Sequence, residues 1–130
     1  MRDMEFRVWN FKAEKMVKVR KLEFLGNRIR VNEDINLTLN MNDKENKSIH
    51  LMQYTGIKDK NNKKIYEGDI VNYYCDFYKE YILLKVVFSV DRFLLKGINT
   101  FSDFEKVDLL DYYKYISVIG NIYENKDLLD

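Results

Sequence analysis

Four lysines close together in the middle of the chain are the first residues whose chemistry could serve a function. Lys58, Lys60, Lys63 and Lys64 fall within seven positions, with two asparagines between them. Clustered ammonium groups on a loop can contact phosphates, so one interpretation is a loop that binds nucleic acid. The other is a solvated turn whose lysines keep a hairpin tip soluble. We favour the turn, because Asp59 lies within the cluster and weakens its positive field.

A pair of carboxylates follows at Glu67 and Asp69. Two carboxylates two positions apart on a strand share a face and could hold a metal or act as general acid and base. No third ligand with suitable spacing follows them. We therefore expect a structural role, in which Gly68 supplies a backbone angle that is strained for other residues and Asp69 accepts backbone N–H groups of the turn.

Nucleophilic chemistry has few candidates in this sequence. His50 is the only histidine and Cys75 the only cysteine. A pairing of His50 with Ser48 or Cys75 stays open, but neither residue lies in a nucleophile motif. We expect His50 at a strand boundary and Cys75 as a small, part-buried hydrophobic residue. One Cys and one His do not make a zinc site within a single chain. Since no catalytic group of residues is visible either, the sequence predicts no enzyme, no metal site and no cofactor.

Aromatic residues interleaved with lysines come next in the chain: Tyr73, Tyr74, Phe77, Tyr78, Lys79, Tyr81 and Lys85. Such a mixture can stack single-stranded bases at roughly 1–3 kcal/mol per base. It can equally form a core or a subunit interface, where tyrosine buries area and keeps a polar tip. We favour core or interface, since Asp76 and Glu80 place negative charge in the cluster.

Strands must position these side chains, and the patterning predicts them in both halves of the chain. In the first half we expect strands over residues 5–9, 16–20, 22–25, 29–31 and 35–41. Gly26-Asn27 separates the third from the fourth and favours a tight hairpin turn. The last of these strands alternates apolar and polar residues from Ile35 to Met41, which predicts a half-buried strand.

The second half is predicted to contain strands over residues 70–74, 81–88, 93–96 and 115–123. Near-helical spacing of apolar residues predicts a short helix near 102–110, capped by Ser102 or Asp103. The tail from Glu124 is expected to form a short helix or an extended arm. The residues predicted to lie in the core are Trp9, Val71, Val87, Phe93, Val118 and Ile122.

Composition narrows the class of protein. A chain of 130 residues can bury a real core within one domain. Its 22 basic and 21 acidic residues leave a net charge of +1, so the basic excess typical of a dedicated duplex-DNA binder is missing. A single cysteine excludes an internal disulfide and fits a reducing cytoplasm. No apolar run has the length of a signal peptide or a membrane span.

Three segments form longer motifs: Phe6-Arg7-Val8-Trp9, the run LMQYTGIKDKNNKKIYEGDIV over Leu51–Val71, and VIGNIYEN over Val118–Asn125. Together they resemble the YopX-like family of small proteins from phages and prophages of low-GC Gram-positive bacteria. The family pattern reads roughly FRxW, LMQxTGLKDKNGKxIYEGDIV and VIGNIYENPELL. Asn62 stands where the family has glycine, and Lys126 where it has proline. Asparagine tolerates the left-handed conformation, so the loop should keep its shape.

The resemblance implies an origin in a mobile element and a cytoplasmic location in the bacterial host, and it carries no established activity. We expect a mainly β fold in one unit over residues 1–130. Its two lobes would be N-terminal hairpins over 1–50 and a small SH3-like or similar compact β-barrel over 51–130, with at most one or two short helices.

The function that we expect is that of a non-enzymatic accessory protein that binds protein partners and not membranes. Exposed strand edges and the Leu128-Leu129 tail suggest a homo-oligomer. The alternative is a module for single-stranded nucleic acid. Either role would use a surface formed by Lys58, Lys60, Lys63, Lys64, Tyr73, Tyr74 and Tyr78.

Overall fold

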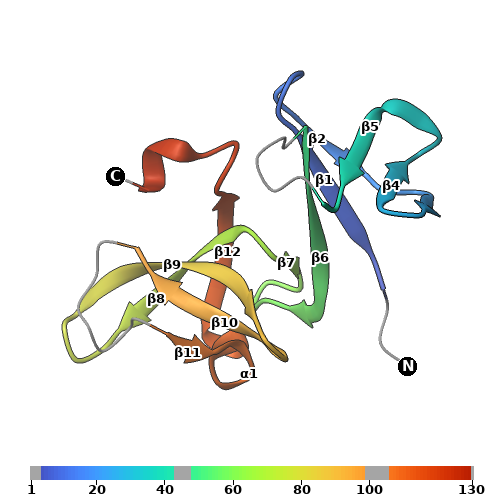
Figure 1. Ribbon diagram of the computed structural model, residues 1–130. Coiled ribbons are helices and arrows are strands. Elements are labelled where there is room, and N and C mark those ends of the chain that lie inside the picture. Colours follow the sequence, from blue (N-terminus) through green and yellow to red (C-terminus); the bar gives the residue numbers. More distant parts are fainter. Residues whose placement is uncertain (1–3, 43–47, 99–105, 130) are drawn as a thin grey trace. The chain divides into compact units, whose positions relative to one another are not determined.

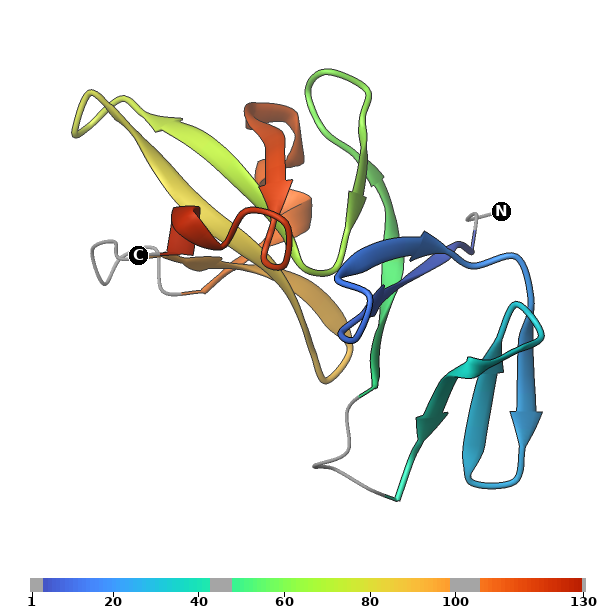
Figure 2. The same ribbon diagram turned by 90° about the horizontal axis from the view of Figure 1, so that it is seen from above.

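Strands dominate the computed structural model, which describes residues 4–42, 48–98 and 106–129 (Figures 1 and 2). The mainly β prediction is therefore confirmed. The chain divides between residues 53 and 54 into two compact units. Among the described residues, no helix has the length and apolar character needed to cross a bilayer.

The N-terminal unit consists of antiparallel hairpins. Its strands are β1 (Phe6–Asn10), β2 (Lys15–Lys18), β3 (Leu22–Leu25), β4 (Arg28–Val31), β5 (Asp34–Asn40) and the first part of β6 (Ile49–Lys58). β1 lies between β2 and β6, and β4 lies between β3 and β5. The hairpin turn between β3 and β4 is Gly26-Asn27, as predicted, with Gly26 at a φ of +66°. One core cluster of this unit consists of Val8, Val31, Leu37 and Ile49.

β5 is less regular than its sequence predicts. Arg30 pairs with Thr38 whereas the next residue, Val31, pairs with Asp34, so part of β5 bulges away from β4. A bulge bends a strand and re-aims its side chains. Ile35 is 77% exposed as a result, and the prediction of a half-buried strand is wrong at this end of β5.

Asn32 stabilises the turn between β4 and β5. Asn32 and Glu33 have φ values of +55° and +59°, as a two-residue hairpin turn of type I′ requires. The Asn32 side chain accepts the backbone N–H groups of Arg20 (2.7 Å) and Lys21 (3.1 Å) and donates to the Lys18 carbonyl (2.9 Å). One amide therefore ties the β2–β3 connection to the β4–β5 turn.

The second unit is built around a curled half-barrel sheet of five strands in the order β11-β10-β9-β8-β12 (Figure 1). The strands that lie entirely within this unit are β7 (Lys64–Tyr66), β8 (Asp69–Cys75), β9 (Glu80–Ser89), β10 (Arg92–Gly97), β11 (Val107–Asp108) and β12 (Ile116–Asn121). β7 pairs with the end of β6. The helical turns are α1 (Leu109–Tyr112), η2 (Tyr113–Tyr115) and η3 (Lys126–Leu129). The last of these lies in the tail, for which a short helix or an extended arm was predicted.

The register of β9 decides which side chains form the core of this unit. Ile82, Leu84 and Val86 are buried, because alternate residues of a strand face the same side. Val87 faces the other side and is half-buried, so its predicted place in the core is wrong by one residue.

The other predicted core residues fare differently. Trp9, Val71 and Phe93 are buried, as predicted. Val118 is half-buried and packs against the core. Ile122 is only half-buried, because it lies just beyond the end of β12.

The predicted helix near 102–110 is shifted toward the C-terminus. Val107 and Asp108 pair with β10, and this pairing overrides the helical spacing of the apolar residues. α1 begins at Leu109, where the Asp108 side chain accepts the N–H of Leu110 at 3.0 Å. The predicted caps, Ser102 and Asp103, lie outside the described residues.

The sequence motifs pair with one another as neighbouring strands within each unit. In the first unit Val8 pairs with Leu51, which joins FRVW to the start of the central run. In the second unit Val71 pairs with Val118, which joins the end of that run to VIGN. The most distinctive stretches of the chain therefore lie in strands that pair with one another.

The C-terminal motif also builds its own turn. The Asn121 side chain is buried and accepts the N–H groups of Tyr123 (3.0 Å) and Glu124 (2.9 Å). The Asn125 side chain accepts the N–H of Asn121 at 3.0 Å and lies where a Cβ on Gly120 would be. This close approach explains why a glycine stands in the motif.

Candidate functional site

The lysine-rich loop joins β6 to β7 and is organised around Asp59. This side chain is only 7% exposed. Its Oδ1 accepts the N–H groups of Asn61 (2.8 Å) and Lys63 (2.9 Å), and its Oδ2 accepts the N–H of Val118 (2.8 Å). Asn62 has a φ of +66°, the left-handed conformation expected where it replaces glycine. Asp59 is therefore the internal frame of the loop as well as a charge within it.

Further hydrogen bonds hold the loop against the start of β12. The N–H of Lys60 donates to the Ile116 carbonyl at 3.1 Å. The Asn61 amide donates to the Ser117 hydroxyl at 3.1 Å. These contacts bring Lys60 into the neighbourhood of Tyr115, which directly precedes β12.

The four predicted lysines do not form one patch. Lys60 and Lys63 are exposed on the loop, and Lys58 is exposed at the end of β6. Lys64 is half-buried in β7, with its Nζ 5.4 Å from the ring centroid of Tyr54. That geometry is a cation–π contact and draws Lys64 away from the other three.

Lys60 instead shares a shallow groove with two of the predicted tyrosines. The groove has a volume of about 360 Å³ and is lined by Lys60, Tyr73, Tyr74, Asp76, Lys114 and Tyr115. We call it the tyrosine groove. The last pair between β8 and β12 is Tyr73 with Ile116, so β12 does not cover the edge of β8 at Tyr74. Both consecutive tyrosines can therefore reach the same groove.

Aromatic contacts hold the groove's tyrosines in place. Tyr73 meets Tyr112 edge-on at a centroid distance of 5.3 Å, and Tyr74 meets Tyr81 in the same way at 5.1 Å. Such pairs add about 0.5–1.5 kcal/mol beyond the area that they bury. Burial raises the pKa of Tyr73, and the nearby Tyr112 and Cys75 add to the shift.

The groove offers aromatic faces with hydroxyl tips, two ammonium groups and one carboxylate. Tyr115 is 60% exposed, so much of its ring is available to a ligand. Lys60 and Lys114 carry the positive charge and Asp76 the negative charge. This combination can bind a peptide by burial and hydrogen bonding, or stack a base.

The sequence predicts only part of this groove. Lys60, Tyr73 and Tyr74 are brought together, whereas Lys58, Lys63 and Lys64 do not line the groove. Tyr78 also lies outside it, half-buried against the core. Lys114 and Tyr115 were missed. The run Tyr112-Tyr113-Lys114-Tyr115 was the signal, since it repeats the mixture of tyrosine and lysine that marked the first cluster.

The predicted structural role of the Glu67 and Asp69 segment agrees with the geometry. Gly68 has a φ of +88°, and the buried Asp69 accepts the N–H of Tyr66 at 2.8 Å. Across the described ranges, no group of three or more His, Cys, Asp or Glu side chains is placed to hold a metal ion.

Each of the three residues considered for nucleophilic chemistry contributes to strand pairing, backbone hydrogen bonding or the core. His50 lies opposite Trp9 in the ladder between β6 and β1. The Ser48 hydroxyl donates to the Thr38 carbonyl at 2.7 Å. Cys75 is buried in the core of the second unit, as expected for a small hydrophobic residue.

Comparisons with known proteins agree with the fold. The family model described as "YopX protein" matches residues 5–130. The solved structure of protein EF1440 from Enterococcus faecalis is similar at 22% identity, with 100% of both chains covered and a TM-score of 0.66. That of protein yopX from Bacillus subtilis is similar at 23% identity, covering 97% of this chain and 98% of that one, with a TM-score of 0.63. At these identities the likeness to solved structures shows the fold alone. No curated protein matches the chain significantly.

Proposed function

This chain belongs to the YopX family, and from that premise we propose that it is a non-enzymatic binding module that holds a protein partner in the tyrosine groove. The observation that carries the proposal is the meeting of Tyr73, Tyr74 and Tyr115 in one groove rimmed by Lys60 and Asp76. Tyrosine is enriched at the centres of protein interfaces, where it buries area and keeps a polar tip. Charges of both signs on the rim favour a protein surface over a polyanion.

Site-specific photo-crosslinking tests this proposal at the groove itself. A photoreactive phenylalanine analogue replaces Tyr115 in the chain expressed in its bacterial host, and adducts are resolved after irradiation. We expect a discrete protein adduct at this position. The matched control places the same analogue at Phe11, an exposed aromatic residue of the other unit, where that adduct should be missing. Equal adducts at both positions, or none at Tyr115, would overturn the proposal.

A second candidate function is binding of single-stranded nucleic acid in the same groove. It is favoured by Lys60 and Lys114, which lie beside rings on which bases can stack. Asp76 opposes it, as does the net charge of +1. Fluorescence anisotropy with labelled oligonucleotides distinguishes the two candidates. Binding that weakens with salt, and weakens about 5- to 150-fold in Tyr74→Ala, would replace the protein partner with nucleic acid.

The wider setting of the protein forms part of the same proposal. We propose an origin in a phage or prophage, action in the cytoplasm of the bacterial host, and assembly into a homo-oligomer. The family resemblance supports the first two, and exposed strand edges with the Leu128-Leu129 tail support the third. Sedimentation at high micromolar concentration checks the assembly, and a pure monomer there would exclude it.

A further inference from the structure

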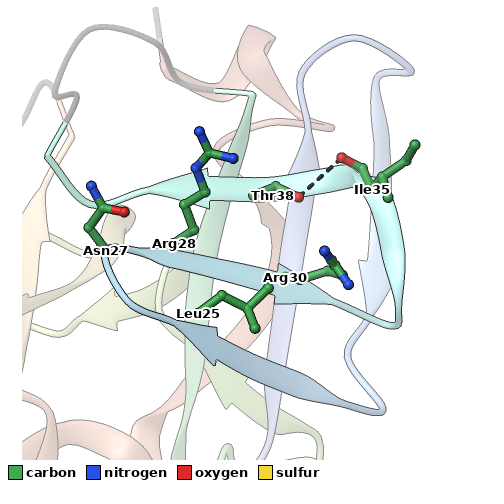
Figure 3. A pocket seen from close by; sticks show the side chains of 6 residues that line it. All are labelled: Leu25, Asn27, Arg28, Arg30, Ile35 and Thr38. Atoms are coloured by element: carbon green, nitrogen blue, oxygen red, sulfur yellow. Dashed lines mark hydrogen bonds between the residues drawn. The ribbon is translucent and has the colours of Figure 1, made fainter.

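A second groove lies in the N-terminal unit, on one face of the three-stranded sheet β3-β4-β5. It has a volume of about 550 Å³ and is lined by Leu25, Asn27, Arg28, Arg30, Ile35 and Thr38 (Figure 3). These side chains come from all three strands and from the β3–β4 turn. We call it the arginine groove. None of its residues belongs to the tyrosine groove, so a ligand of the arginine groove is independent of the function proposed for the tyrosine groove.

Strand register places the two arginines side by side on one face. Arg28 and Arg30 are two positions apart in β4, which separates their Cα atoms by about 7 Å along the strand. Leu25 is the β3 partner of Arg28, and Thr38 is the β5 partner of Arg30. Because paired residues of antiparallel strands point to the same face, these four side chains form one surface.

Among the described residues, the two arginines have no charge partner. Within residues 4–42, 48–98 and 106–129, neither Arg28 nor Arg30 forms an ion pair. The Nε of Arg30 is buried and has no hydrogen-bond acceptor. Glu23 is the β3 partner of Arg30 in the ladder, yet its Oε1 is also buried and has no hydrogen-bond partner among the described residues. The negative charge of Glu23 helps to raise the pKa of Lys21. A buried polar atom without a partner calls for an explanation. The Nε itself is closed to a ligand, but the Arg30 side chain lines the groove, where its charge is available to an anion.

The walls of the groove indicate which anion fits. Leu25 and Ile35 are exposed apolar side chains, and the bulge in β5 places Ile35 at the groove. The six lining residues include no aromatic ring on which a base could stack. Guanidinium groups bind carboxylates through paired, charge-assisted hydrogen bonds. Charge complementarity together with apolar walls therefore favours an acidic peptide over a nucleic acid.

We propose that the arginine groove binds an extended acidic segment of a partner protein. Two carboxylates two positions apart in the segment meet Arg28 and Arg30, since alternate side chains of an extended peptide are also about 7 Å apart. An apolar side chain of the segment packs against Leu25 and Ile35. Asn27 lines the groove with an amide that can bond its backbone, and the Thr38 hydroxyl, which already donates to the Ile35 carbonyl at 3.1 Å, can accept a backbone N–H.

Fluorescence anisotropy with a labelled peptide of alternating glutamate and valine tests this proposal. The wild-type chain should bind it, and the same peptide with glutamine in place of glutamate should bind at least tenfold more weakly. The double variant Arg28→Gln and Arg30→Gln should lose at least tenfold in affinity for the glutamate peptide. Arg20→Gln is the matched control, because Arg20 is an exposed arginine of the same unit outside the groove.

Two further measurements keep the test decisive. Fluorescence of Trp9, buried in the same unit, checks that the double variant is folded. In the wild-type chain, NMR shift changes on adding the glutamate peptide should centre on Leu25, Arg28 and Thr38. Equal binding of the glutamine peptide, equal loss in Arg20→Gln, or no binding at low salt would overturn the proposal. Preference for a single-stranded oligonucleotide, again dependent on Arg28 and Arg30, would replace the peptide with nucleic acid.

Discussion

Replacing Asp59 by asparagine tests whether one carboxylate holds the lysine-rich loop to β12. An asparagine at position 59 loses fewest hydrogen bonds when its side-chain oxygen takes the Oδ1 position, where it still accepts the N–H groups of Asn61 and Lys63. Its NH₂ group then faces the N–H of Val118, so one bond of 2.8 Å is lost and two donors oppose each other. A hydrogen bond to a charged group contributes about 1.5–3 kcal/mol. Water can replace little of it, since Asp59 is only 7% exposed.

We therefore expect Asp59→Asn to lower the free energy of unfolding by about 2–3 kcal/mol. Asp59→Ala removes all three bonds and should cost about 3–5 kcal/mol, less than three separate bonds because the three are coupled. Urea denaturation followed by far-UV circular dichroism measures both values. Hydrogen exchange at the Val118 amide reports on the bond itself and should speed up in both variants.

Lys63→Ala is the control for the same loop. Its side chain is exposed and only its backbone N–H and carbonyl meet Asp59, so the free energy of unfolding of this variant should stay within about 0.5 kcal/mol of wild type. If Asp59→Asn were as stable as this control, with the Val118 amide still protected, Asp59 would not be the frame of the loop.

Three other predictions concern β9, its turn and the tyrosine groove. Val86→Ala should lower the free energy of unfolding by about 2 kcal/mol because Val86 is buried, while Val87→Ala should lower it by less than half as much. Equal losses in urea denaturation would contradict the register of β9. Val90 is 96% exposed and has a φ of +56°, a conformation that costs a β-branched residue about 1–2 kcal/mol. Val90→Gly should therefore stabilise the chain by about 0.5–1 kcal/mol. A lower melting temperature of this variant would argue against the strain. Burial raises the pKa of Tyr73, so the stability that its protonated form gives is present below the unfolded-state pKa near 10 and is lost as pH rises through the higher folded value. Between about pH 9 and 11, wild type should therefore lose more stability than Tyr73→Phe, and parallel losses would show that Tyr73 does not contribute.

Local rules explain which features the sequence predicts well. Gly26-Asn27, Asn62 and Gly68 each depend on the backbone preferences of one or two residues, and their turns form as expected. The same holds for Asp69, whose side chain bonds a backbone N–H only three residues away. These features require no knowledge of the rest of the chain.

Features that depend on distant pairing were the ones missed. Whether Val86 or Val87 faces the core is set by the register of β9 between β8 and β10. Lys60 reaches the tyrosine groove on a loop whose Asp59 bonds Val118, 59 positions further along the chain. A single sequence identifies the tyrosines and lysines but does not show which of them meet.

The course of β6 determines how this protein can be dissected. Gln53 pairs with Phe6 in the first unit, and the very next residue, Tyr54, pairs with Tyr66 in the second. A cleavage or fusion point between the units would therefore fall within a continuous strand, although each half of β6 would keep its own ladder partner, β1 before the cut and β7 after it. Insertions and affinity labels are better tolerated at the tip of the β9–β10 hairpin, where Val90 is 96% exposed and no strand is shared between the units.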